Sequence, residues 1–291
     1  MRGGRPVAAA LAAALLAGCA MTAPTAPPPI SPPTSPPTPR LAPPPGYALA
    51  WSDEFDRDGP PDPAKWVHDT ARNKEGWYNH EQQYYGGPGA GNAVVRGGRL
   101  LITARLESPS AAPDWGGQRY TSARLITRGK AAWTYGFFEV RARMPCGRGT
   151  WPAIWLVGAG GRWPEDGEID ILEHVGSAPQ RVSSAVHTAA GSAGAAAHGN
   201  ARRPDACRAL HDYQLLWTAQ GLWFGVDGVV HWHYPNQGAA DPGGWPFDRP
   251  QFLILNLALG GDLGGAVDAA ALPATLEVDH VRVYQPRGGF P

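Results

Sequence analysis

Short stretches of alternating apolar and polar residues, separated by turns rich in glycine and proline, recur along this 291-residue chain. In residues 136–144, every second residue from Phe138 to Met144 is apolar. Successive side chains of a strand point to opposite faces, so this alternation indicates a half-buried strand. Asp227-Gly228 between two apolar runs predicts a hairpin with a type I′ turn. Further predicted strands are residues 98–104, 120–126, 222–226, 229–234, 252–259 and 276–284. No segment has helical periodicity, so we expect an all-β fold of two packed antiparallel sheets.

The N-terminal segment predicts export. A basic start, residues 1–5, precedes an apolar run over residues 7–17 that is too short to span a bilayer, an order typical of secretory signal peptides. The run ends in LAGC, which resembles a bacterial lipobox with Cys19 as the lipidated residue; a chance cysteine is the alternative. We expect residues 1–19 to be a lipoprotein-type signal peptide. Because Ala20 follows instead of Asp, we expect an outer-membrane lipoprotein, periplasmic or on the cell surface, or otherwise a secreted protein.

Residues 20–45 are a predicted proline-rich linker. Twelve of the 31 prolines lie in this segment, which has one charged residue, Arg40, and no aromatic residue. A polyproline spacer of this length could reach roughly 80 Å. Without Arg2, Arg5 and Arg40, the 25 basic residues fall to 22 against 25 acidic ones, so residues 46–291 carry a net charge of −3. That charge does not fit a nucleic-acid-binding protein. We expect one monomeric domain whose only membrane contact is the lipid anchor.

Two cysteines, Cys146 and Cys207, remain for this domain if Cys19 carries lipid. In an oxidising compartment such a pair predicts one disulfide, worth roughly 4 kcal/mol in the chain-entropy model. Two free buried thiols are the alternative. A metal site is not expected, because neither cysteine has a second cysteine or a well-spaced histidine beside it in the sequence.

Three carboxylates interrupt an apolar strand in residues 167–173 (GEIDILE). In a regular strand Glu168 and Asp170 share a face, whereas Glu173 would point among the isoleucines, where a charge is costly. One inserted residue, a β-bulge, returns Glu173 to the face of Glu168 and Asp170. Retaining glycoside hydrolysis uses two carboxyls about 5–5.5 Å apart, and a third can separate their pKa values. An exposed acidic strand or a calcium site is the alternative.

The GEIDILE segment resembles the active-site signature of glycoside hydrolase family 16. Its bulged form, with two residues between Asp170 and Glu173, is similar to the laminarinase branch. The resemblance covers residues 48–285 and implies a jelly-roll β-sandwich with a concave substrate cleft, so that residues 46–291 form the catalytic domain. Other blocks similar to the family, in the expected order, are residues 51–55 (WSDEF), 120–124 (YTSAR), 149–155 (GTWPAIW), 255–261 (LNLALGG) and 278–284 (VDHVRVY).

Carried over to these residues, the resemblance implies Glu168 as nucleophile, Glu173 as general acid and base, and Asp170 as the partner of the nucleophile. No cofactor is required for catalysis. Many family members hold a structural Ca²⁺, and the matching positions are Glu54, the Gly98 carbonyl and Asp279. Surface salt bridges of the two carboxylates are the alternative.

Seven further residues are candidates for binding sugar. Trp151, Trp155 and Trp133 could stack on sugar rings, with core packing as the alternative. Arg124 and Asn256 are expected to face the cleft and form hydrogen bonds.

The other two candidates are Asn79 and His187. Asn79 lies in a loop where the family usually has two successive asparagines, but His80 occupies the second position here. His187 follows the catalytic strand and could support Glu173 or a sugar hydroxyl; a structural histidine is the alternative.

We therefore expect a retaining endo-β-1,3-glucanase that acts on laminarin-like β-glucan. Alternatives are hydrolysis or transglycosylation of another polysaccharide, such as mixed-linkage β-glucan, agar or carrageenan, or a non-catalytic glucan-binding protein. The sequence shows no sulfate-binding basic cluster near the cleft, which counts against sulfated galactans. The presence of both Glu168 and Glu173 counts against a binding protein.

Overall fold

Residues 40–241 and 243–289 are described by the structure, a computed structural model of the chain. The predicted signal peptide, Cys19 and most of the predicted linker lie outside the described residues. The described part forms two sheets, one of ten strands and one of seven. Every paired strand is antiparallel to its neighbour except β3 and β6, which are parallel. The fold is thus the expected jelly-roll β-sandwich.

The ten-stranded sheet consists of β1 (Tyr47–Asp53), β3 (Gln83–Tyr85), β4 (Ala93–Val95), β5 (Leu100–Leu106), β6 (Tyr120–Ser122), β8 (Gly136–Arg143), β13 (His211–Thr218), β14 (Gly221–Val226), β15 (Val229–Pro235) and β17 (Ala274–Pro286). The seven-stranded sheet has the order β12 (Ala197–Arg202), β11 (Arg181–His187), β10 (Glu168–His174), β9 (Thr150–Gly158), β16 (Gln251–Leu259), β7 (Arg124–Ile126) and β2 (Val67–His68). Helical turns in the described part are α1 (Gly261–Gly264), η1 (Tyr78–His80), η2 (Ala193–Ala195), η3 (Gly238–Ala240) and η4 (Ala269–Ala271).

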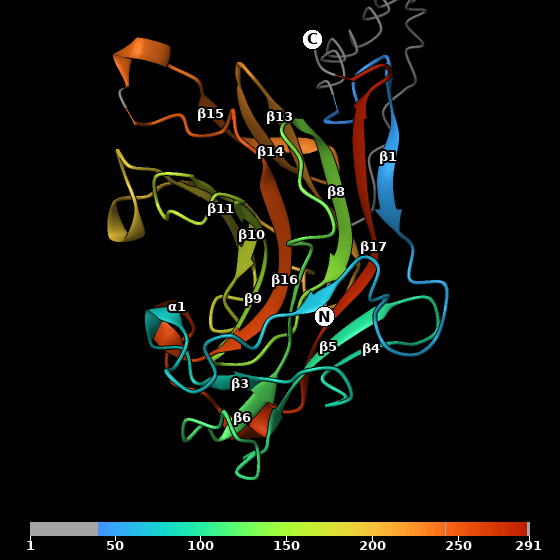
Figure 1. Cartoon of the computed structure of the whole chain (residues 1–291), viewed down its shortest axis with the longest axis vertical. Helices are drawn as coiled ribbons and strands as arrows, with labels where there is room; N and C mark the ends of the chain where they lie inside the picture. The colour runs from blue at the N-terminus through green and yellow to red at the C-terminus, as the bar shows by residue number, and fades with distance from the viewer. Residues whose placement is uncertain (1–39, 242, 290–291) are drawn as a thin grey trace, which may run out of the picture. The chain divides into compact units, whose positions relative to one another are not determined.

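Figure 1 shows β9, β10, β11 and β16 side by side in one layer, with β8, β13 and β17 in the other. The core lies between these layers, where alternate side chains of strands such as β5 and β8 are apolar and buried. Phe138 and Val140 of β8 enter this core, as the alternation predicts. Phe137 points to the opposite face, yet it is also buried and packs against Tyr284 of β17.

The predicted strand over residues 120–126 is two strands. The chain leaves the ten-stranded sheet after Ser122 and enters the seven-stranded sheet at Arg124, where β7 pairs with β16 and β2. Ala123, between the two strands, is fully buried in the core. The crossing matters for the site because it places Arg124 opposite Asn256.

Two local predictions are confirmed. Asp227 and Gly228 both have positive φ, 53° and 79°, as a type I′ turn between β14 and β15 requires. Cys146 and Cys207 form a disulfide with their Cα atoms 5.7 Å apart. Sequence spacing did not reveal that His174 of β10 lies beside the two sulfur atoms, but these atoms are bonded to each other and are not free to bind metal. No helix among the described residues is long and apolar enough to cross a membrane.

Candidate active site

The predicted bulge is present in β10. Asp170 pairs with Ala185 of β11 and Glu173 pairs with Ser183, so two residues of β10 oppose one residue of β11. The two residues in the bulge, Ile171 and Leu172, are both buried in the core. The bulge therefore turns Glu173 to the same side as Glu168 and Asp170.

All three carboxylates line one cavity of about 1150 Å³. Alternate residues of the seven-stranded sheet form its floor, among them Trp151 and Trp155 of β9 and Asn256 of β16. Loops before β3 and before β10, together with α1, contribute to its walls. The site is therefore built on paired strands, which hold the carboxylates in fixed positions.

Burial changes the acidity of Glu168. Its pKa is raised from 4.5 to about 8, mainly because burial removes water from the carboxyl and next because of the negative charge of Asp170. The charge of His187 and a hydrogen bond from Trp163 act in the opposite direction. Without these two groups, Glu168 would hold its proton even more strongly.

Asp170 and Glu173 also have raised pKa values, in both cases mainly because they are buried. The charge of Glu173 raises the pKa of Asp170 further. Three neighbouring carboxyls in a buried site cannot all be ionised at neutral pH. The hydrogen bond between Glu168 and Asp170 lowers the pKa of Asp170, so protonated Glu168 is the donor and Asp170 accepts.

Each of the two glutamates receives a hydrogen bond from one tryptophan. Trp151 Nε1 donates to Glu173 Oε1 at 3.1 Å, and Trp163 Nε1 donates to Glu168 Oε2 at 2.7 Å. Each hydrogen bond lowers the pKa of its glutamate and so opposes the effect of burial. Trp163 was not among the predicted site residues, although it lies only five positions before Glu168.

Asp166 anchors the loop that carries Trp163. Its carboxylate accepts hydrogen bonds from the backbone N–H and the side chain of Arg162, at 3.0 Å each, and from Arg249 at 2.9 Å. Asp166 itself is buried. This anchor explains how a tryptophan that is 49% exposed can still lie in contact with Glu168.

Three of the predicted sugar-binding residues form one connected group on the cavity floor. Arg124 makes an ion pair with Asp69 at 2.9 Å, and its guanidinium lies over the ring of Trp155. Trp155 Nε1 donates to Asn256 Oδ1 at 2.8 Å, and Asn256 donates to Tyr85. Arg124 therefore occupies one face of Trp155.

Asn79 lies at the cavity wall in η1, with a positive φ of 55°. His80 does not line the cavity; its Nδ1 atom lies 2.7 Å from Asp262 Oδ1, which joins η1 to α1. Both side chains of this pair are exposed. The histidine at the second asparagine position thus contacts the helical turn α1.

His187 pairs with Glu168 across β10 and β11. Its Nε2 atom lies 3.2 Å from Asp170 Oδ2 and 3.8 Å from Glu168 Oε1. We expected it to support Glu173 or a sugar hydroxyl, but its close contacts are with the other two carboxylates.

Trp133 was wrongly predicted to be a sugar-stacking residue. It is 6% exposed, does not line the cavity, and packs edge-to-face against Trp51 and Phe138 in the core. Core packing, the alternative for this residue, is what the structure shows.

Two further features of the cavity were not expected from the sequence. Glu81 lines it, and burial raises the pKa of this carboxyl despite hydrogen bonds from Gln83 and Tyr85. Arginines also line it, contrary to the expectation of no basic cluster near the cleft. They are Arg72, Arg124, Arg128, Arg162 and Arg181.

The two carboxylates matched to a calcium site lie in ion pairs. Both guanidinium nitrogens of Arg282 that face Glu54 donate to it, at 3.0 and 2.7 Å. Asp279 lies 3.8 Å from Arg99 and 4.0 Å from Arg141. Positive groups thus already neutralise both carboxylates, and the side chains as they lie do not fit a calcium ion.

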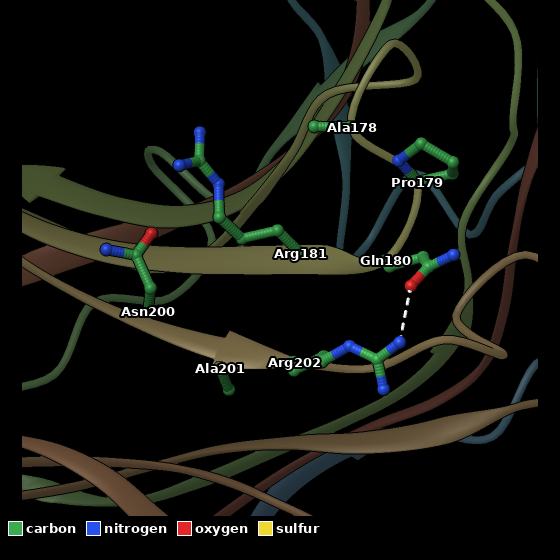
Figure 2. Close-up of a pocket in the computed structure, with 7 residues that line it drawn as sticks. All are labelled: Ala178, Pro179, Gln180, Arg181, Asn200, Ala201 and Arg202. Carbon is green, nitrogen blue, oxygen red and sulfur yellow. Dashed lines mark hydrogen bonds between the residues drawn. The ribbon is translucent and has the colours of Figure 1, made fainter.

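A second hollow, of about 530 Å³, lies on the surface at residues 178–181 and 200–202. Figure 2 shows its polar side chains, including the hydrogen bond from Arg202 to Gln180. No carboxylate or histidine lines it, so it lacks groups for acid–base chemistry.

Comparison with known proteins agrees with this geometry. A model of the family described as "Glycosyl hydrolases family 16" matches residues 90–280. A "Beta-glucanase" of Rhodothermus marinus is 47% identical in an alignment of 254 residues that covers 83% of this chain and 86% of that protein. The X-ray structure of the laminarinase from Rhodothermus marinus superposes with a TM-score of 0.77 at 48% identity, covering 82% of this chain and 97% of that one. SCLam, described as a non-specific endo-beta-1,3(4)-glucanase, has a TM-score of 0.82 at 45% identity, covering 85% and 94%.

Proposed function

The chain belongs to glycosyl hydrolases family 16, and on that basis we propose that it is a retaining endo-β-1,3-glucanase acting on laminarin-like β-glucan. The observation that carries the proposal is the bulged strand β10, which brings Glu168, Asp170 and Glu173 into one cavity. The similarity to a laminarinase and to a beta-glucanase supports β-glucan as the substrate.

The reaction has two displacements. In the first, a Glu168 oxygen attacks the anomeric carbon, the bond to the glycosidic oxygen breaks, and protonated Glu173 gives its proton to the departing oxygen. In the second, ionised Glu173 takes a proton from water, the water oxygen attacks the anomeric carbon, and the ester bond to Glu168 breaks. Transfer of the shared proton from Glu168 to Asp170 leaves Glu168 ionised for the attack.

Two substitutions test this assignment. Glu168→Gln should abolish laminarin hydrolysis and retain laminarin binding, because an amide keeps the shape but cannot act as the nucleophile. Glu173→Gln should also lower activity strongly, by roughly the 10²–10⁴-fold that general acid–base catalysis contributes. Laminarin turnover by purified Glu168→Gln protein at the wild-type rate would refute the assignment.

Mixed-linkage β-1,3-1,4-glucan is the second candidate substrate. SCLam is described as non-specific, and a variant of it crystallised with 1,3-beta-D-cellotriosyl-glucose presents 1,3-beta-D-cellobiosyl-glucose at its active site. Incubation of residues 46–291 with laminarin, lichenan, agarose and carrageenan, followed by mass spectrometry of the products, would rank the substrates and detect transglycosylation. Because arginines line the cavity, the carrageenan sample also tests whether the enzyme accepts a sulfated galactan.

We also propose that the domain is exported and anchored through Cys19. The support is the order of basic residues, apolar run and LAGC in the sequence. The substitution Cys19→Ala should move the protein from the membrane fraction to the soluble fraction, and mass spectrometry of the wild-type N-terminus should detect the lipid. We further propose that the catalytic domain is a monomer, which sedimentation would test.

For Glu54 and Asp279 we propose a structural role as ion pairs, in place of calcium binding. The pairing of Glu54 with Arg282 supports this role. The unfolding midpoint should then be the same in EDTA and in millimolar Ca²⁺. A clear rise in calcium that Glu54→Gln abolishes would instead support a calcium site.

A further inference from the structure

Three potential metal ligands converge inside the active-site cavity. They are Glu168 Oε1, Asp170 Oδ2 and His187 Nε2, which all lie within 4.8 Å of one another. The nitrogen is 3.2 Å from the aspartate oxygen and 3.8 Å from the glutamate oxygen. A tetrahedral zinc ion with ligands at about 2.0–2.1 Å has ligand–ligand edges of roughly 3.4 Å. The observed separations therefore suit a zinc ion with little movement of the side chains.

A buried atom without a hydrogen bond gives independent support. Asp170 is only 4% exposed, and in the described part of the chain its Oδ2 atom makes no hydrogen bond; its near neighbour is His187 Nε2 at 3.2 Å, which carries a positive charge only when the imidazole is protonated. Such an atom is expected to have a partner, and a cation is one that a carboxylate can accept. Glu168 is already oriented, because its other oxygen, Oε2, accepts the hydrogen bond from Trp163.

The scaffold and the charge of the site also favour a cation. Glu168 and His187 are paired residues on adjacent strands, and Asp170 is two residues along the same strand as Glu168, so the three ligands are in place before any ion arrives. The carboxyl of Glu173 lines the same cavity and adds a negative charge when it is ionised. An imidazole with two carboxylates selects zinc over Mg²⁺ or Ca²⁺, which prefer oxygen ligands alone.

We propose that Zn²⁺ binds Glu168, Asp170 and His187 and thereby inhibits the enzyme reversibly. The fourth coordination position of the ion stays open toward the cavity. The ion coordinates the Glu168 carboxylate and so blocks its attack on the sugar. The inhibition rests on the proposed hydrolase function, whereas the binding site itself does not.

Calorimetric titration of metal-free protein with ZnCl₂ tests the site directly. The wild type should bind one Zn²⁺. The variant His187→Gln should raise the Kd at least roughly tenfold, the lower end of what loss of even an outer partner costs a metal site. His198→Gln changes the other histidine of the cavity and is the matched control, expected to keep the wild-type Kd within about twofold.

Glu168→Gln is a second variant that should also weaken zinc binding. If His187→Gln does not fold, the Kd of Glu168→Gln tests the site in its place. Absence of zinc binding by the wild type would overturn the proposal. So would a wild-type Kd in Glu168→Gln or His187→Gln, or a loss of binding in His198→Gln.

The inhibition has its own measurement. ZnCl₂ should raise the KM for laminarin without changing kcat, EDTA should reverse the effect, and MgCl₂ at the same concentration should have none. A zinc effect on kcat alone would contradict inhibition at this site. If the protein does not hydrolyse laminarin at all, the proposed function fails while calorimetry still decides whether zinc binds.

Discussion

At the scale of single residues, the two glutamates proposed to be catalytic differ in how they are held. Glu173 receives its hydrogen bond from Trp151, a floor residue that is 7% exposed, whereas Glu168 receives its hydrogen bond from Trp163 on a loop. The hydrogen bond from Trp163 favours the ionised form of Glu168, the form that a nucleophile needs. Trp163 is therefore a positioning residue whose loss should alter the pH dependence of the reaction.

Trp163→Phe keeps an aromatic ring and removes the N–H donor. Because that donor lowers the pKa of Glu168, the pKa should rise and the acidic limb of kcat/KM should move to higher pH. A hydrogen bond to a charged group contributes about 1.5–3 kcal/mol, so kcat/KM should fall roughly 10–100-fold at pH 6. Kinetics between pH 4 and 9 would measure both effects.

The control is Trp115→Phe. Trp115 is also exposed, at 37%, but its N–H donates to the Gln118 carbonyl and it does not line the cavity. An unchanged acidic limb in Trp163→Phe would show that the hydrogen bond does not tune Glu168.

At the scale of elements, the loop between β9 and β10 and the bulge in β10 together define the site. The loop returns the chain to the sheet at Gly167, immediately before Glu168. Gly167 has φ of 80°, and a Cβ atom there would lie 2.7 Å from Pro246 and 2.8 Å from Phe247. Only glycine suits both this conformation and this close approach.

Gly167→Ala should lower both stability and activity, because the added carbon must push Pro246 or shift Glu168. Overpacking typically costs about 1–3 kcal/mol, so the unfolding midpoint should fall by at least about 2 °C. Gly161→Ala is the matched control in the same loop: φ is 82°, and the nearest atom to its Cβ is Arg128 Nη2 at 3.8 Å. Equal losses in the two variants, measured by calorimetry and kcat, would exclude the clash as the cause.

The sequence predicted the bulge in β10 correctly, because a strand without the bulge would bury a charged side chain. A regular β10 would bury Glu173 in the core, so the pattern of residues 167–173 requires the bulge that is present. Periodicity could not show that the chain changes sheets at Ala123, because alternation tells which face is buried and not which strand is the neighbour. It also could not separate Trp133 in the core from Trp151 in the cavity, since both lie among apolar residues.

Contacts that depend on loop conformation or on strand register could not be predicted from the sequence. The hydrogen bond from Trp163 to Glu168 depends on a loop anchored by Asp166 and Arg249, which are 83 residues apart. The position of His187 beside Asp170 depends on the register of two strands that the bulge shifts. Such contacts follow from the assembled fold.

At the scale of the whole molecule, the buried carboxyl of Glu168 lowers the free energy of unfolding at neutral pH. Glu168 has an ordinary pKa of 4.5 and a folded pKa of about 8, so the folded protein binds more protons than the unfolded chain between these values. The free energy of unfolding therefore falls as the pH rises through this window. The fold keeps buried carboxyls that do not stabilise it, as expected of a functional site.

Glu168→Gln removes this titration. The variant should unfold at a higher temperature than the wild type, and its advantage should be at least about 2 °C larger at pH 8 than at pH 4.5. Scanning calorimetry at the two pH values measures the difference. An advantage that does not change with pH would mean that the raised pKa of Glu168 is not a property of the folded protein.

The account as a whole depends on a double displacement at Glu168 and Glu173. The most direct measurement is ¹H NMR of the first products released from laminarin, recorded before mutarotation equilibrates the new reducing ends. Double displacement predicts that these ends appear first as the β-anomer. Initial appearance of the α-anomer would contradict it.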